Sequence, residues 1–178
     1  LRILGSNMNL VGNKFNDVEH GHQRTPLMAV VESGDGEQVK KMLASEVDLT
    51  ATNDRGADVF DMAIQSGDPE DADATVLRLL LQHGANPNLP DPNEGQKQSP
   101  SGKTFVPPLS RAACYGSVAC VEAMLDHDAD VNKTHGIEER SALVEVVLSD
   151  VDAAAQIAIA TLLLEHGANV DHKTSDHE

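Results

Sequence analysis

Hydrophobic residues along the chain gather in two short phrases that alternate and recur. A leucine-rich phrase, Leu-Leu-Leu, Gln or Glu, then His-Gly-Ala-Asn, stands at residues 79–86 and 162–169, with weaker copies at 42–49 and 124–132. A second phrase precedes each copy and begins at Thr25, Asp58, Pro107 and Ser141. Its copies lie 33 residues apart between 25 and 58, and 34 apart between 107 and 141. Self-similarity at a fixed period of this length predicts a repeat architecture.

Each unit is predicted to be a pair of helices. Thr25 and Ser141 are residue types that cap helix N-termini, and Pro26 and Pro108 suit a first helical turn. The apolar face of the Leu-rich helix must pack against a neighbour, so the units must stack. Glycine follows most copies of both phrases and suits the left-handed end of a helix, at positions 34, 67, 84, 116 and 167.

These phrases resemble the ankyrin repeat, whose pattern is Thr-Pro-Leu-His-x-Ala, a short helix, Gly, a second helix ending in Leu-Leu, and Gly-Ala-Asp before a loop. The similarity covers about residues 20–172, although no copy has His after the Leu and only the first keeps Thr-Pro. The resemblance implies an all-α ankyrin-repeat solenoid, built from stacked helix-turn-helix pairs with projecting β-turn or hairpin loops.

On this pattern the whole chain, 1–178, forms a single ankyrin-repeat domain. Residues 67–81 and 150–164 are each five residues longer than the matching segment 34–43, so the second helices of repeats 2 and 4 are predicted to be longer by about 7 Å. Residues 11–23 are predicted to be a long loop. The other predicted segments are a partial repeat at 1–19, repeats at about 20–52, 53–90, 102–134 and 135–172, and an insertion loop at 91–106.

The composition limits the kinds of partner. The chain has 13 Lys and Arg against 29 Asp and Glu, a formal net charge of -16, and no basic stripe that would attract nucleic acid. It has no run of about 18 apolar residues that would predict a membrane-spanning helix. Cys114 and Cys120 are too few for a disulfide framework, so both are expected to be reduced, buried and structural. We therefore expect an intracellular protein, cytoplasmic or nuclear.

Three groups of residues resemble sites of chemistry but are better explained by the repeat. The segment 101–104, Ser-Gly-Lys-Thr, lacks the glycine that a phosphate-binding loop carries five residues before its Gly-Lys pair. The alternating acids at 126, 128 and 130 lack the Gly and Glu that a calcium loop needs further on. His83, His127 and His166 share one repeat position, where they would bond helix-end carbonyls and stand a layer apart. No catalytic, cofactor or metal site is predicted, and the chain is not expected to be an enzyme.

The resemblance implies that the chain binds a protein partner through a concave face made of loop tips and first helices. We interpret the chain as a protein–protein interaction scaffold within a larger protein; the alternative is a targeting or regulatory segment of a larger enzyme or channel. We expect a monomer with no nucleic-acid partner and no membrane insertion. The predicted contact residues at the tips are Arg24, Arg55, Ala57, Lys103, Phe105, Glu138 and Arg140. Those predicted on the exposed side of the first helices are Glu32, Ser33, Gln65, Ser66, Arg111, Tyr115 and Leu148.

Overall fold

The computed structural model describes residues 15–16, 23–66, 74–90, 105–136 and 138–171. Four consecutive helix pairs make up most of this part of the chain. Two short strands, β1 (Phe15–Asn16) and β2 (Gln23–Arg24), precede the first pair. The pairs are α1 (Pro26–Glu32) with α2 (Gly36–Leu43), α3 (Val59–Ser66) with α4 (Thr75–Gln82), α5 (Pro108–Tyr115) with α6 (Val118–Leu125), and α7 (Ala142–Leu148) with α8 (Ala153–Glu165).

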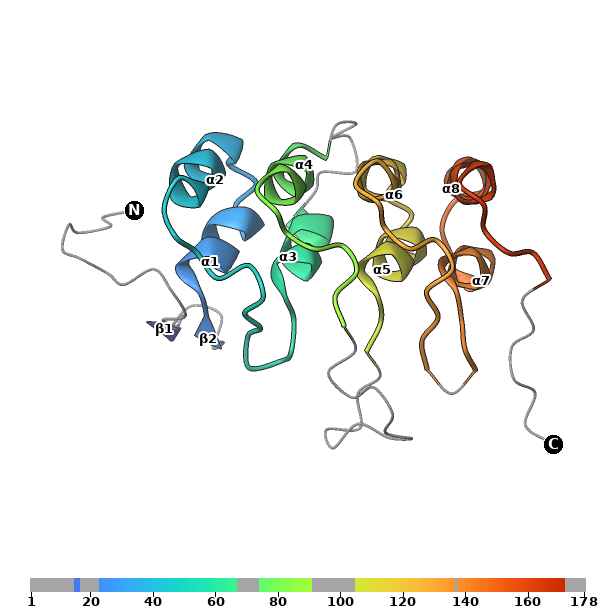
Figure 1. Cartoon of the computed structure of the whole chain (residues 1–178), viewed down its shortest axis with the longest axis horizontal. Coiled ribbons are helices and arrows are strands. Elements are labelled where there is room, and N and C mark those ends of the chain that lie inside the picture. Colours follow the sequence, from blue (N-terminus) through green and yellow to red (C-terminus); the bar gives the residue numbers. More distant parts are fainter. Residues whose placement is uncertain (1–14, 17–22, 67–73, 91–104, 137, 172–178) are drawn as a thin grey trace.

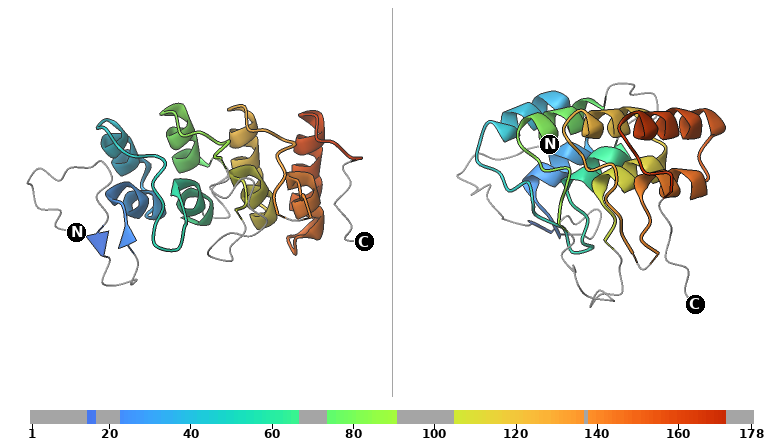
Figure 2. Two further views of the ribbon diagram at one scale, coloured as in Figure 1. Left: turned by 60° about the horizontal axis from the view of Figure 1, so that its bottom comes forward. Right: turned by 45° about the vertical axis from the view of Figure 1, so that its right-hand side comes forward.

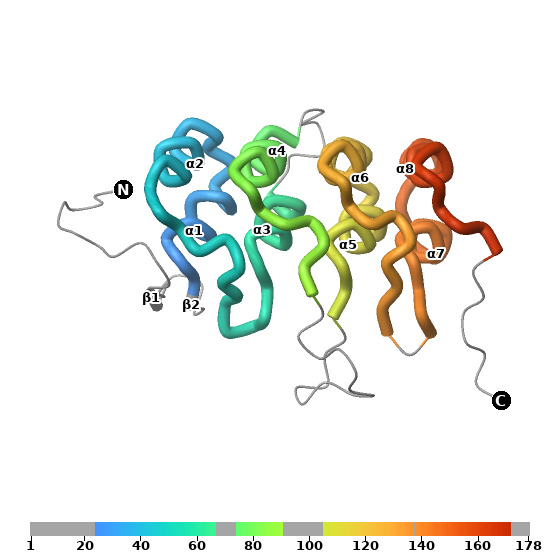
Figure 3. Tube along the Cα trace, in the orientation of Figure 1, coloured from blue at the N-terminus to red at the C-terminus, as the bar shows by residue number. Residues whose placement is uncertain are grey.

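The pairs stand side by side in a single row (Figure 1). The first helices, α1, α3, α5 and α7, form one layer, and the second helices, α2, α4, α6 and α8, form the other. Each helix packs against its neighbour in the same layer as well as against the other helix of its pair. The Cα trace of the helices follows a similar path in every pair, and the described parts of the loops between pairs project on the side of the first helices (Figure 3). The predicted all-α stack of helix-turn-helix units is confirmed.

Side-chain caps begin the helices where the sequence predicts them. The hydroxyl oxygen of Thr25 accepts a hydrogen bond from a backbone N–H of the first turn of α1 at 3.2 Å, and that of Ser141 does the same for α7 at 3.4 Å. Each cap satisfies an N–H group that has no partner inside its helix. The helices α2, α6 and α8 begin in the same way, with Asp35, Ser117 and Asp152 as N-caps.

Left-handed residues follow the ends of several helices. Gly84 (φ 90°) and Gly167 (φ 85°) follow α4 and α8, and Asp128 (φ 60°) stands at the same repeat position after α6. Gly116 ends α5 with φ 76°, and a Cβ added there would meet Val151 Cγ1 at 2.8 Å. Both the backbone conformation and the lack of space therefore require glycine at position 116.

The hydrophobic core runs through the whole stack. Leu27, Phe60 and Leu109 occupy one repeat position in successive first helices and are 2%, 0% and 3% exposed. In the second helices, Leu80 and Leu163 are fully buried at another common position. Because each pair buries its apolar side chains against its neighbours, stability belongs to the stack rather than to any one pair.

Asparagine side chains join successive pairs beyond the helices. Asn88 Nδ2 donates to Asp128 O at 2.8 Å, and Asn88 Oδ1 accepts from Asp130 N at 2.7 Å. Asn132 makes the same two bonds with the loop after α8, at 3.1 and 2.8 Å. Each asparagine thus satisfies one carbonyl and one N–H of the next repeat, which helps to fix the register of the pairs.

The lengths of two second helices and the segment 11–23 were predicted from the sequence, with different outcomes. Helix α8 has 13 residues against 8 in α2 and α6, so the longer second helix of repeat 4 is confirmed (Figure 2). The same prediction for repeat 2 is wrong, because α4 has only 8 residues and follows Ala74, whose left-handed φ of 44° a helix cannot pass through. The loop predicted at 11–23 contains strand pairing, with Phe15 opposite Arg24.

Candidate functional site

The first helices place equivalent residues in line along the stack. Glu32, Gln65, Cys114 and Leu148 occupy the same position in successive helices, and all four are exposed. In the next position three serines bond back to their own helix, with Oγ to carbonyl distances of 2.7, 3.4 and 2.8 Å. Together these positions form the helix-end row: Glu32, Ser33, Gln65, Ser66, Cys114, Tyr115, Leu148 and Ser149.

The helix-end row changes from polar to apolar along the stack. Its α1 and α3 members are Glu, Gln and Ser, whereas Tyr115 of α5 is 57% exposed and Leu148 of α7 is 61% exposed. Val147 adds a further exposed apolar side chain in α7. Val147 was not predicted as a contact residue, because the matching residues Val31 and Ile64 are buried and the pattern indicates core at this position.

A groove with a volume of about 1570 Å³ passes the helix-end row. Four predicted contact residues are among those that line it, namely Ser33, Gln65, Ser66 and Tyr115. The structure therefore brings residues from three repeats to one surface depression, of the kind in which an extended partner can be held.

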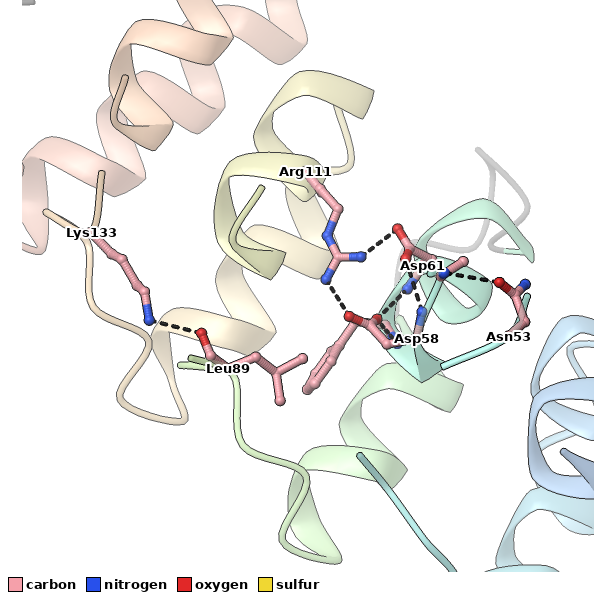
Figure 4. Close-up of polar contacts among 8 residues, drawn as sticks. Asn53, Asp58, Asp61, Leu89, Arg111 and Lys133 are labelled. Atoms are coloured by element: carbon pink, nitrogen blue, oxygen red, sulfur yellow. Dashed lines mark hydrogen bonds and ion pairs between the residues drawn. The ribbon is translucent and has the colours of Figure 1, made fainter. Parts of the chain in front are cut away.

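Arg111 does not lie exposed on this face, and the prediction that it does is wrong. Its guanidinium turns from α5 towards the start of α3, where Nη2 lies 2.8 Å from Asp58 Oδ2 and Nη1 pairs with Asp61 (Figure 4). Asp58 also caps α3, because its Oδ1 accepts from Phe60 N at 2.9 Å and from Asp61 N at 3.0 Å. Arg111 is thus a link between two repeats.

The electrostatics of this cluster follow from its burial. The side chains of Asp58, Asp61 and Arg111 are 6%, 14% and 13% exposed. Burial raises the pKa of Asp61, although the charge of Arg111 acts in the opposite direction. The two carboxylates raise the pKa of Arg111 despite its own burial, so the guanidinium stays charged.

Two other predicted arginines are also held by carboxylates. Arg24, in β2, is buried and forms an ion pair with Glu32. Arg140 lies beside His135 in a bridge between backbone segments, and its guanidinium pairs with Glu138 and lies 3.7 Å from Glu145. Because carboxylates pair with both arginines, these cations add little free positive charge to the first-helix face.

The loop tips lie at the opposite ends of the first helices from the helix-end row. Asn53 shapes the tip before α3, since its Oδ1 accepts from Arg55 N and from Ala57 N, both at 2.9 Å. Arg55 is exposed there, while Ala57 is half-buried. Before the later first helices, Phe105 is half-buried and Glu138 is exposed. The predicted contact Lys103 and the loop at 91–104 lie outside the described residues.

The histidines and cysteines, the side chains most suited to metal binding or catalysis, are explained by their places in the helices. The ring Nδ1 atoms of His83, His127 and His166 lie 2.8–2.9 Å from the carbonyl four residues earlier, as predicted. Both cysteines are free; Cys120 is buried as predicted, but Cys114 is exposed, because its position faces outward in the last turn of α5. Partial burial of its thiol, and then the charge of Glu145, raise the pKa of Cys114, which disfavours a reactive thiolate.

None of the helices in the described residues is long and apolar enough to cross a membrane. Nor do three or more His, Cys, Asp or Glu side chains in this part of the chain come together as metal ligands would.

Comparison with known proteins agrees with the architecture. A family profile described as the ankyrin repeat matches residues 107–135, which include α5, α6 and the loop that follows them. No curated protein matches the chain. The three other helix pairs stack on the matched unit in the same two layers. Residues 107–135 thus match an ankyrin repeat, and the helix pairs around them form an all-α stack consistent with that repeat.

Proposed function

We propose that the chain is a scaffold segment that binds a protein partner through the face of its first helices, from the loop tips to the helix-end row. Ankyrin repeats are in general protein-interaction modules and typically have no catalytic role. The observation that carries the proposal is the exposure of Tyr115 and Leu148, at 57% and 61%, on neighbouring first helices.

These two side chains have the properties of binding anchors. Tyrosine provides a large, rigid contact surface with a polar tip, and it is enriched where alanine substitution costs most affinity. An exposed apolar group gains free energy when a partner removes it from water. Tyr115 is also the single tyrosine of the chain, which makes its exposed position more informative than that of a common residue.

The polar half of the helix-end row would supply the rim of the interface. Hydrogen-bond donors and acceptors beside the groove come from Ser33, Gln65 and Ser66. Glu32 adds a carboxylate on the same face. Polar rims of this kind add hydrogen bonds and specificity around an apolar centre. Arg24 and Arg111 would support the face from within, through their ion pairs, rather than touch the partner.

The remaining predicted contacts at the tips stay part of the proposal. Arg55 and Glu138 are exposed, and Arg140 is partly exposed with its charge shared with Glu138. Phe105 and Ala57 are half-buried and would contact a partner only through their outer edges. A location inside the cell, in the cytoplasm or nucleus, is supported by the free thiols of Cys114 and Cys120.

Site-specific photocrosslinking tests the assignment of the face. A photoreactive amino acid at position 115 or 148 should capture a protein partner in cells. The same group in place of Lys41, which is exposed on α2, should not capture that partner. With that partner purified, Tyr115→Ala or Leu148→Ala should weaken binding by about tenfold each, and Lys41→Ala should leave it unchanged. Capture through position 41 together with unaltered affinity of both face variants would show that the proposal is wrong.

A further inference from the structure

The groove beside the helix-end row runs along the whole stack. Each repeat contributes to its lining, with Ser33, Ser66, Tyr115 and Asp152 as one example from each. Neighbouring helices in a layer lie about 8–10 Å apart, so a segment that crosses all four repeats spans roughly 30 Å. The volume of about 1570 Å³ also exceeds the roughly 300–1,000 Å³ of small-molecule sites. The groove therefore suits an extended piece of polypeptide better than a small ligand.

Helix α8 lengthens the groove at the fourth repeat. Leu125 and Leu164 occupy the same repeat position, but α6 begins at Val118 whereas α8 begins at Ala153. Helix α8 thus has about one more turn before this position, or roughly 6 Å. Asp152, at the start of that turn, lines the groove. Short side chains also line it, since Gly116 and the alanines at 119, 155 and 158 are all half-buried there.

The charged residues that line the groove are acidic. They are Glu122 and Asp152, both exposed, and no Lys, Arg or His among the described residues joins them. Arg78 pairs with Glu122 at 3.0 Å and with Asp126 at 3.1 Å, so these three side chains together keep one negative charge. Asp152 caps α8 through Oδ1, and its full charge exceeds the partial positive charge of about one half at a helix N-terminus.

The sequence that connects two lining residues is acidic too. Between Ser66 and Ala74 it contains four Asp or Glu residues and no Lys or Arg. The chain as a whole has a net charge of -16. A cleft lined by one sign of charge concentrates ligands of the opposite sign. The charges therefore favour a cationic occupant.

An aromatic ring and a carboxylate belong to the same stretch of the lining. Gly116 and Val151 are in such close contact that a Cβ added at Gly116 would lie 2.8 Å from Val151 Cγ1. Tyr115 precedes Gly116 and Asp152 follows Val151, and both side chains are exposed. The face of a tyrosine ring attracts Lys and Arg side chains, and a carboxylate accepts hydrogen bonds from them.

We propose that the groove binds an extended, basic segment of the protein partner. An Arg or Lys of that segment contacts Tyr115 and Asp152, and its small apolar side chains pack against the alanines of α6 and α8. The inference rests on the proposed function, because it names the chemistry of the partner at the same face. Opposite charges across such an interface speed association and exclude acidic competitors.

Selection from a displayed library of random peptides tests the chemistry of the occupant. Peptides of about ten residues can span the groove at about 3.3 Å per residue. Those selected on the whole chain should be enriched in Arg and Lys over the starting library. A selected peptide, made synthetically, should bind more weakly when salt is raised from about 0.1 M to about 1 M, because the screening length falls from about 10 Å to about 3 Å.

Two matched aspartate variants test the electrostatic contact. Asp152→Asn should weaken binding of the selected peptide about fivefold, since asparagine still caps α8 but carries no charge. Asp35→Asn makes the same change at the cap of α2, which lies three repeats away and outside the lining, and should leave the affinity unchanged.

Two substitutions of Tyr115 test the role of the ring. Tyr115→Phe keeps the aromatic face and should retain the affinity for the selected peptide. Tyr115→Leu keeps an apolar side chain without the ring and should weaken binding about threefold. Equal affinities of these two variants would show that no cation contacts the ring and would overturn the proposed contact.

The failure of this inference can be distinguished from that of the proposed function. A selection that yields no peptide, peptides without enrichment in Arg and Lys, or equal affinity of the wild-type chain and Asp152→Asn would overturn the basic segment. If a partner captured through position 115 or 148 also binds both chains equally, the face stands and only its chemistry is wrong. If basic peptides bind through Asp152 but no partner is captured through either position, the proposed function fails instead.

Discussion

Replacing Arg111 with methionine keeps an unbranched apolar side chain but removes the cation that Asp58 and Asp61 share. Both acids are at least 86% buried, from exposed fractions of 6% and 14%, so water cannot readily take the place of the guanidinium. Removing one partner from a buried ion pair costs about 3–5 kcal/mol. A typical domain has a free energy of unfolding of only about 5–15 kcal/mol. We therefore expect Arg111→Met to remove a large part of the stability at neutral pH.

The pH dependence of this loss identifies its cause. Burial raises the pKa of Asp61 even with Arg111 present, and without the cation the pKa should rise further. A carboxyl whose pKa is higher in the folded state destabilises the fold above that pKa, and the penalty disappears as pH falls to the unfolded value, near pH 4. Urea titrations should therefore show a difference between wild type and Arg111→Met that shrinks on acidification.

A second substitution provides the control for the Arg111 prediction. Asp61→Asn in the Arg111→Met background removes one of the two uncompensated charges and should recover part of the lost stability at neutral pH. A loss below about 0.5 kcal/mol for Arg111→Met, or a larger loss that is the same at both pH values, would refute the reasoning.

Further predictions concern the core, a helix end and a link between repeats. Leu80→Ala should lower the free energy of unfolding by about 2–5 kcal/mol, because the side chain is fully buried; a loss under about 0.5 kcal/mol would contradict its burial. Gly116→Ala should cost more than Gly34→Ala in urea titration: both have positive φ, but only at 116 would the new Cβ meet Val151. Equal losses would show that the backbone alone matters. Asn132→Ala should speed amide exchange in the loop after α8 and cost about 1 kcal/mol; unchanged exchange would exclude this link.

The features that sequence predicts well in this chain are local and repeated. The caps Thr25 and Ser141 depend on a side chain and an N–H three residues away, and both were predicted from residue type and position. Gly84 and Gly167 end helices in the left-handed conformation that their place in the repeat indicates. Recurrence in four units makes each local signal stronger, which is why the stack could be predicted from sequence.

Contacts between repeats were harder to predict. Arg111 was expected on the surface because its position in the repeat lies on the outward side of a first helix. Its burial depends on Asp58 and Asp61, about fifty residues earlier, which the stacking brings to the neighbouring first helix. The start of α4 depends on the left-handed backbone conformation of Ala74, which an alanine in a sequence does not indicate. The repeat boundaries and the contact residues on the first-helix face stay predictions.

Distances between spin labels test the linear order of the helix pairs most directly. The labels are placed at equivalent, exposed positions at or just after the ends of second helices. Ala44, Asp126 and Glu165 are suitable sites, introduced as cysteines with the exposed Cys114 replaced by serine. Packed helices lie about 8–10 Å apart, so the distance from 44 to 126 should be about 20 Å and that from 44 to 165 about 30 Å. A distance from 44 to 165 that is equal to or shorter than that from 44 to 126 would contradict the stack.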